Sequence, residues 1–154
     1  MPQRADVCII HLKAFEGKIG MHGNMNLGGV ELLVPADSGM LLAIRMTTAG
    51  VLARAGLTAD MLEDMKTVVA EAFSCLISQS CVCPRVRIVY QVEGGALTVS
   101  LCGEGAPAPD CGCMLSEDEL KIVVCIFESM VDAVDMRREP SGQMCINLTK
   151  QLSR

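Results

Sequence analysis

The residues whose types and spacing most directly suggest chemistry are cysteines in two Cys-x-Cys pairs. The pairs are Cys81-Val82-Cys83 and Cys111-Gly112-Cys113, in a chain that contains nine cysteines. Four thiolates can bind zinc, but structural zinc sites usually have at least two residues between paired cysteines. Unpaired thiols in loops are therefore the favoured interpretation, and a metal or redox role for the thiols is the alternative. His11 and His22 lie outside any motif and predict no ligand.

A carboxylate and a thiol share one face of a predicted helix. Glu71 and Cys75 are one helical step apart, and residues 62–72 have the apolar spacing of an amphipathic helix. Further along, Gly103-Glu104-Gly105 is a glycine-rich signal of low specificity, and a turn between a strand and a loop is a sufficient interpretation.

The composition predicts one domain with a sizeable core. The chain has 154 residues, 51% of them hydrophobic, and a formal net charge of −5. No run of Lys or Arg suggests a nucleic-acid surface, and no apolar stretch reaches membrane-spanning length. The first residues lack the apolar core of a secretion signal, so we expect a cytoplasmic protein in which disulfides are less common than free thiols.

Periodicity and turn residues predict the elements that position these side chains. One helix is expected between Asp37 or Ser38 and Gly56, a second begins at the cap residue Thr58, and a third runs from the capping box at Ser116 to about residue 130. Strands are expected at 7–13, 30–34, 85–90, 96–101, 131–136 and 144–148, with a loop at 102–115. This order favours an α+β two-layer sandwich, a mostly antiparallel sheet with helices on one face.

In this frame, residues 62–72 (Leu-Glu-Asp-Met-Lys-Thr-Val-Val-Ala-Glu-Ala) resemble the N-box helix of the anti-sigma-factor serine kinases. That family, which includes an anti-sigma factor of sporulation, has the histidine kinase-like (GHKL, or Bergerat) ATPase fold. The resemblance runs in register from about Val30 to Leu152, and residues 1–29 form an extension outside the domain at 30–154. It also includes Pro35-Ala36, Ala43-Ile44-Arg45, Met130-Val131-Asp132 and Ile146-Asn147-Leu148-Thr149-Lys150.

The resemblance assigns the family's ATP-site positions to residues of this chain. The general-base glutamate is retained as Glu71, but the magnesium-binding asparagine is replaced by Cys75, and a thiol is a poor ligand for a hard cation. The adenine-binding aspartate falls on a glycine, which has no side-chain acceptor. Gln79 takes the place of a histidine that is common in the family, and Gly103 and Gly105 correspond to the adenine-binding loop. Lys121-Ile122-Val123 takes the place of the phosphate-binding Gly-x-Gly. Arg45 corresponds to an arginine that faces the protein partner.

Three functions follow from these observations. The favoured one is a degenerate anti-sigma regulator that binds a sigma factor or an anti-sigma antagonist as a homodimer, with Glu71 as a vestigial base and no ATP, magnesium or other cofactor. The alternatives are an active ATP-dependent serine/threonine protein kinase and a thiol or metal sensor.

Overall fold

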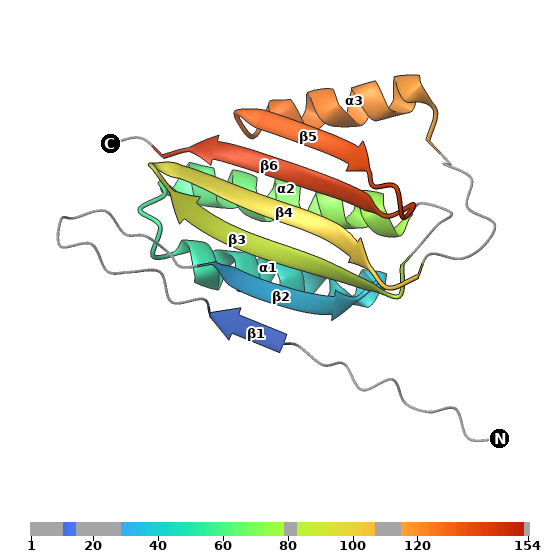
Figure 1. The fold of residues 1–154 in the computed structure, drawn as a ribbon. Helices are drawn as coiled ribbons and strands as arrows, with labels where there is room; N and C mark the ends of the chain where they lie inside the picture. Colours follow the sequence, from blue (N-terminus) through green and yellow to red (C-terminus); the bar gives the residue numbers. More distant parts are fainter. Residues whose placement is uncertain (1–10, 15–28, 79–82, 107–114, 153–154) are drawn as a thin grey trace.

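The computed structural model describes residues 11–14, 29–78, 83–106 and 115–152, and shows two layers (Figure 1). One layer is a six-stranded antiparallel sheet with the strand order β1-β2-β3-β4-β6-β5. Its strands are β1 (His11–Ala14), β2 (Val30–Pro35), β3 (Arg85–Glu93), β4 (Ala96–Glu104), β5 (Ala133–Arg138) and β6 (Met144–Gln151). The predicted α+β two-layer sandwich is confirmed.

The helices lie on one face of this sheet. A 3-10 turn, η1 (Ser38–Met40), leads into α1 (Leu41–Leu52), and α2 (Ala59–Ile77) and α3 (Glu117–Glu128) follow. In Figure 1, α1 lies behind β2 and β3, α2 behind β4 and β6, and α3 beside β5, whereas the face toward the viewer carries no described helix. A sheet covered on one side buries alternate residues of each strand and leaves the others in solvent.

The starts of α2 and α3 agree with the cap residues predicted from the sequence, whereas Asp37 caps the 3-10 turn η1 and α1 has Met40 at its N-cap with no side-chain hydrogen bond. Asp37 accepts a hydrogen bond from the backbone N–H of Gly39 at 2.6 Å, and the Thr58 hydroxyl accepts one from the N–H of Met61 at 3.2 Å. Ser116 and Glu119 form the predicted capping box, with distances of 3.3 Å and 2.7 Å for its two hydrogen bonds. The hydrogen bonds from the Ser116 backbone and hydroxyl lower the pKa of Glu119.

The hairpin formed by β3 and β4 is longer than predicted. Gly94 and Gly95 have φ angles of 60° and 79°, which fit the type I′ turn that joins twisted strands. β4 then continues past the predicted end at Leu101, because Arg87, Val86 and Arg85 pair in register with residues 102, 103 and 104. The prediction of a loop at 102–104 was therefore wrong.

The core fills the space between the sheet and the helices. The inward residues of β3 and β4 are Val86, Ile88, Tyr90, Val92, Leu97, Val99 and Leu101, and the buried stripe of α2 contains Met65, Val69, Ala72, Phe73 and Leu76. One polar pair lies inside this core. The hydroxyls of Thr48 and Tyr90 are 2.8 Å apart, and Thr48 also donates to the carbonyl of Ile44 at 2.8 Å. Burial raises the pKa of Tyr90 to about 12.

The edges of the sheet differ slightly from the predicted strands. β1 begins at His11 and pairs with β2, so it overlaps the end of the strand predicted at 7–13, while residues 1–10 and 15–28 lie outside the described part. β5 begins at Ala133 and not at 131, because the chain leaves α3 through a turn in which the N–H of Val131 donates to the carbonyl of Phe127.

Candidate functional site

The retained glutamate and the neighbouring cysteine occupy successive turns of α2. Glu71 is exposed to solvent, whereas Cys75 is half-buried and packs against the core. The carbonyl of Cys75 accepts a hydrogen bond of 3.0 Å from the Ser78 hydroxyl near the end of α2. Thus the carboxylate faces water, and the side chain one turn later faces apolar neighbours.

The end of β4 packs closely against the segment that precedes β3. Gly103 is paired with the buried residue Val86, so a side chain at position 103 would point toward the helix side of the sheet. A Cβ atom at Gly103 would lie 2.8 Å from Cys83 Sγ and 3.1 Å from Cys83 Cβ. Cys83 is only 5% exposed, and burial raises the pKa of its thiol. The space that a side chain at position 103 would need is filled.

Position 105 also lacks space for a side chain. Its φ of 100° is unfavourable for residues with a side chain, and a Cβ there would lie 2.5 Å from Pro84 Cγ. Its carbonyl accepts a hydrogen bond of 2.9 Å from the Gln143 side chain. Backbone conformation and packing against Pro84 therefore explain the glycine at position 105 without a bound ligand.

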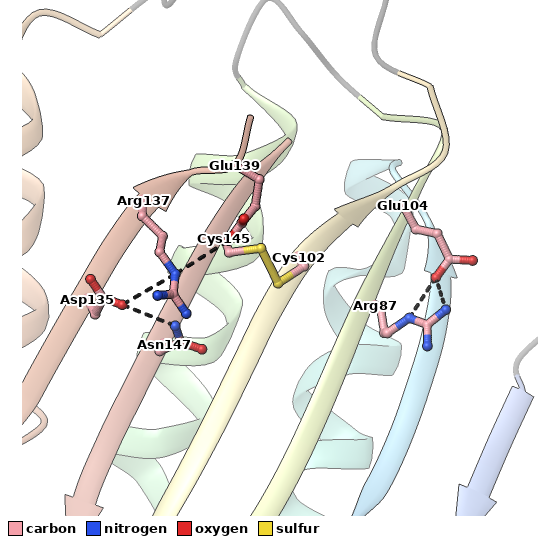
Figure 2. The surroundings of a disulfide bond; sticks show 8 residues. All are labelled: Arg87, Cys102, Glu104, Asp135, Arg137, Glu139, Cys145 and Asn147. Carbon is pink, nitrogen blue, oxygen red and sulfur yellow. Dashed lines mark hydrogen bonds and ion pairs between the residues drawn. A yellow bond between two sulfur atoms is a disulfide. The ribbon is translucent and has the colours of Figure 1, made fainter. Parts of the chain in front are cut away.

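Glu104 lies on the opposite, open face of the sheet (Figure 2). Its carboxylate forms an ion pair with the Arg87 guanidinium, accepts a hydrogen bond from Arg87 Nε at 2.7 Å and lies 3.5 Å from Arg85. Arg87 also lies 3.2 Å from Glu31, and the hydrogen bond to Glu104 raises the pKa of Arg87. Gly103 and Glu104 thus belong to a strand, and the interpretation of this segment as a turn was wrong.

The start of α3 is strongly acidic. Its first turn contains Glu117, Asp118 and Glu119, and the N–H of Leu120 already donates to the carbonyl of Ser116 at 3.0 Å. Lys121 is exposed and lies 3.1 Å from Asp118. Because residues 121–123 follow the first turn, their N–H groups belong to the hydrogen-bond ladder of the helix and are not free to bind an anion.

An exposed apolar pair on α1 lies beside Arg45. Leu42 is 71% exposed and Met46 65% exposed, whereas Arg45 is half-buried. On α2, a hydrogen bond of 2.6 Å from Lys66 lowers the pKa of Glu63, and the charge of Arg45 contributes to this shift. Leu42, Arg45 and Met46, which we call the α1 surface, combine a cation with apolar side chains.

Two cysteines that are distant in sequence form a disulfide, which sequence reasoning missed. Cys102 on β4 and Cys145 on β6 are separated by 43 residues and bonded to each other (Figure 2). The expectation of free thiols was therefore wrong for this pair. The signal that would have found it is the register of β4 and β6, which places the two residues directly opposite each other.

Several predicted features lie outside the described residues. These are Gln79, Cys81, the pair at Cys111 and Cys113, and His22; for His11 only the backbone is described. Within the described ranges, no group of three or more His, Cys, Asp or Glu side chains is arranged to hold a metal ion. In the same ranges, no helix is both long enough and apolar enough to cross a bilayer.

The fold is similar to that of a solved bacterial protein. The crystal structure of the RsbU and RsbW domains of Rv1364c from Mycobacterium tuberculosis superimposes with a TM-score of 0.58 at 16% sequence identity. The match covers 80% of this chain and 33% of the solved chain, so this protein corresponds to about a third of its length. No protein-family model matches the sequence, and no curated protein matches it.

Proposed function

We propose that this chain is a regulator of the anti-sigma type that acts by binding a protein and does not use ATP. The observation that carries the proposal is the packing of Cys83 against Gly103. By the resemblance, position 103 should present an aspartate to adenine, but it has neither the side chain nor the space for one. The residues at the corresponding positions therefore do not fit a bound adenine.

The magnesium and phosphate positions support the same proposal. Magnesium prefers oxygen ligands, and a half-buried thiol at position 75 supplies none. An anion is stabilised at a helix N-terminus by free N–H groups and by the helix dipole. In α3, the capping box occupies such groups and three carboxylates surround them, so a triphosphate would meet negative charge.

The α1 surface is the candidate contact for a protein partner. Leu42 and Met46 expose apolar area next to a cation, and interfaces are enriched in methionine and arginine at their centres. The resemblance places the partner-facing arginine at Arg45. We propose that the partner is a sigma factor or an anti-sigma antagonist, that residues 30–154 form the binding domain, and that the chain acts as a homodimer.

A binding assay without nucleotide tests this proposal. The tagged chain is mixed with purified sigma factors and anti-sigma antagonists from its own genome, and the affinity of each pair is measured. We expect one partner to bind, and we expect Leu42→Ser/Met46→Ser and Arg45→Glu to weaken that complex at least tenfold. Ile122→Ser/Ile126→Ser is the matched control, since it removes an equally spaced exposed apolar pair from α3. Failure of every candidate to bind, or equal loss in the control, contradicts the proposal.

One observation favours the alternative of an active serine/threonine kinase: Glu71 is retained and faces solvent on α2. A kinase would transfer labelled phosphate from ATP to the bound antagonist, and Glu71→Gln would abolish the transfer. We expect no transfer by either the wild-type chain or the variant.

A further inference from the structure

Four side chains form a row across the open face of the sheet. Arg87 on β3 is paired in register with Cys102 on β4, Cys102 with Cys145 on β6, and Cys145 with Arg137 on β5. The disulfide is at the centre of this row, with one arginine on each side (Figure 2). The Cα atoms of the two cysteines are 4.2 Å apart, the close spacing of facing residues that are not hydrogen-bonded to each other.

The two cysteine residues differ in accessibility. Cys145 is only 7% exposed, whereas Cys102 is partly exposed, and no described helix covers this face of the sheet. A thiolate that attacks the bond from solvent therefore reaches Cys102 more readily than Cys145. Exchange depends on which sulfur is accessible and on how well the other one leaves.

A cationic residue is paired in register with the cysteine that would leave. Arg137 is directly opposite Cys145, and a guanidinium beside a cysteine stabilises its thiolate. Arg137 lies 3.7 Å from Asp135 and 3.5 Å from Glu139, while Asp135 also accepts a hydrogen bond from Asn147 at 3.3 Å. The distances from Arg137 to its carboxylates are longer than those from Arg87 to Glu104 and Glu31, which are 2.7 Å and 3.2 Å. The charge of Arg137 is therefore neutralised less by its ion pairs than the charge of Arg87.

We propose that the Cys102–Cys145 bond is a thiol–disulfide exchange site that a dithiol reductant opens in the folded protein. One thiolate of the dithiol attacks Cys102 Sγ, which forms a mixed disulfide and releases Cys145 as a thiolate beside Arg137. The second thiolate of the dithiol then attacks the reductant sulfur that is bonded to Cys102. This breaks the mixed disulfide and releases Cys102 as a thiolate. Two electrons pass to the protein, the dithiol becomes a cyclic or internal disulfide, and the two cysteine thiolates take up the protons that the dithiol lost.

The fold provides a reason for the reduced chain to stay folded. The bonded pair is the last pair of the β4–β6 register, and both cysteines lie on the open side of the sheet. Beyond this pair, β4 remains paired to β3 through Glu104, and Gln143 holds the carbonyl of Gly105. Opening the bond therefore removes a link at the sheet surface and leaves the core contacts in place.

Alkylation under native conditions tests the proposal. The chain is purified without reductant, treated with dithiothreitol for increasing times and quenched with N-ethylmaleimide, and labelling is measured residue by residue by mass spectrometry. Buried Cys83 reports unfolding, and exposed Cys125 is the positive control for the reagent. We expect Cys102 and Cys145 to become labelled together while Cys83 stays unlabelled.

The role of the arginine is tested by comparing two variants. Arg137→Gln removes the charge opposite Cys145, and Arg138→Gln removes the same charge from the next residue of β5, which is paired with Met144 on the other face. We expect Arg137→Gln to slow native reduction roughly three- to tenfold and Arg138→Gln to leave the rate unchanged. A chain purified without this disulfide, labelling of Cys83 in step with Cys102, or equal rates for the two variants would each overturn the proposal.

Discussion

Cys83 Sγ occupies the position toward which a side chain at Gly103 would point, 2.8 Å from the place of its Cβ atom. Cys83 precedes β3 and Gly103 lies near the end of β4, so the contact joins the two ends of one hairpin. Around this contact the space that a side chain at position 103 would need is filled by Cys83. Because of this contact, position 103 has no room for the aspartate that the resemblance would place there, which supports the proposed regulator that works without a nucleotide.

The first prediction concerns this contact. Gly103→Ala places a methyl group against Cys83 and should destabilise the chain by about 1–3 kcal/mol, as overpacked cores do. Cys83→Ala in the same chain removes Sγ and should recover most of that loss. Urea unfolding of the wild type, both single variants and the double variant measures the coupling. Additive effects in this cycle would mean that the two residues do not compete for the same space.

The second prediction concerns alkaline pH. Because burial raises the pKa of Tyr90 to about 12, folding favours the protonated phenol. This contribution is fully present below the unfolded pKa of about 10 and is lost as the pH rises through about 12, at about 1.4 kcal/mol per pH unit. Unfolding free energies measured across this range should fall more steeply for the wild type than for Tyr90→Phe.

The same variant has a second effect at neutral pH. Tyr90→Phe removes the hydrogen bond to Thr48, whose hydroxyl keeps its bond to the carbonyl of Ile44. We therefore expect a loss of about 1 kcal/mol at pH 7. Parallel stability curves for the two proteins between pH 9 and roughly pH 12 would contradict the assignment of the alkaline loss to Tyr90.

The third prediction concerns the start of α3. Ser116→Ala removes the hydroxyl that accepts the hydrogen bond of the Glu119 N–H, and the loss of such a cap costs about 1 kcal/mol. Hydrogen exchange should become faster in the first turns of α3 and stay unchanged in α2. The pKa of Glu119 should rise only part of the way toward its usual value in an NMR titration, because the variant removes the hydrogen bond from the Ser116 hydroxyl but keeps the one from the backbone at position 116. An unchanged exchange rate in α3 would show that the capping box does not stabilise the helix.

Features set by neighbouring residues could be predicted from the sequence. The caps at Thr58 and Ser116 and the turn at Gly94-Gly95 each depend on a few adjacent residues, and all three form as predicted. The amphipathic character of α2 was also predicted, because the apolar residues within 62–72 recur at helical spacing. The two-layer fold followed from the order of these local elements.

Features set by pairing between distant segments could not be predicted in the same way. β4 continues to Glu104 because Arg85 pairs with it from another strand, and the disulfide depends on the register of β4 with β6. The sequence also indicated that Gly103 lacks the aspartate, but it gave no sign that Cys83 fills the space. Each of these facts depends on two residues that only the folded sheet brings together.

The most direct test of the account is equilibrium dialysis of the wild-type chain against labelled ATP with magnesium. We expect no saturable binding, and we expect the melting temperature to stay constant as the ATP concentration rises, since a ligand of the native state must raise it. Saturable binding of one ATP per chain, lost in Glu71→Ala, would contradict the proposal that the chain works without a nucleotide.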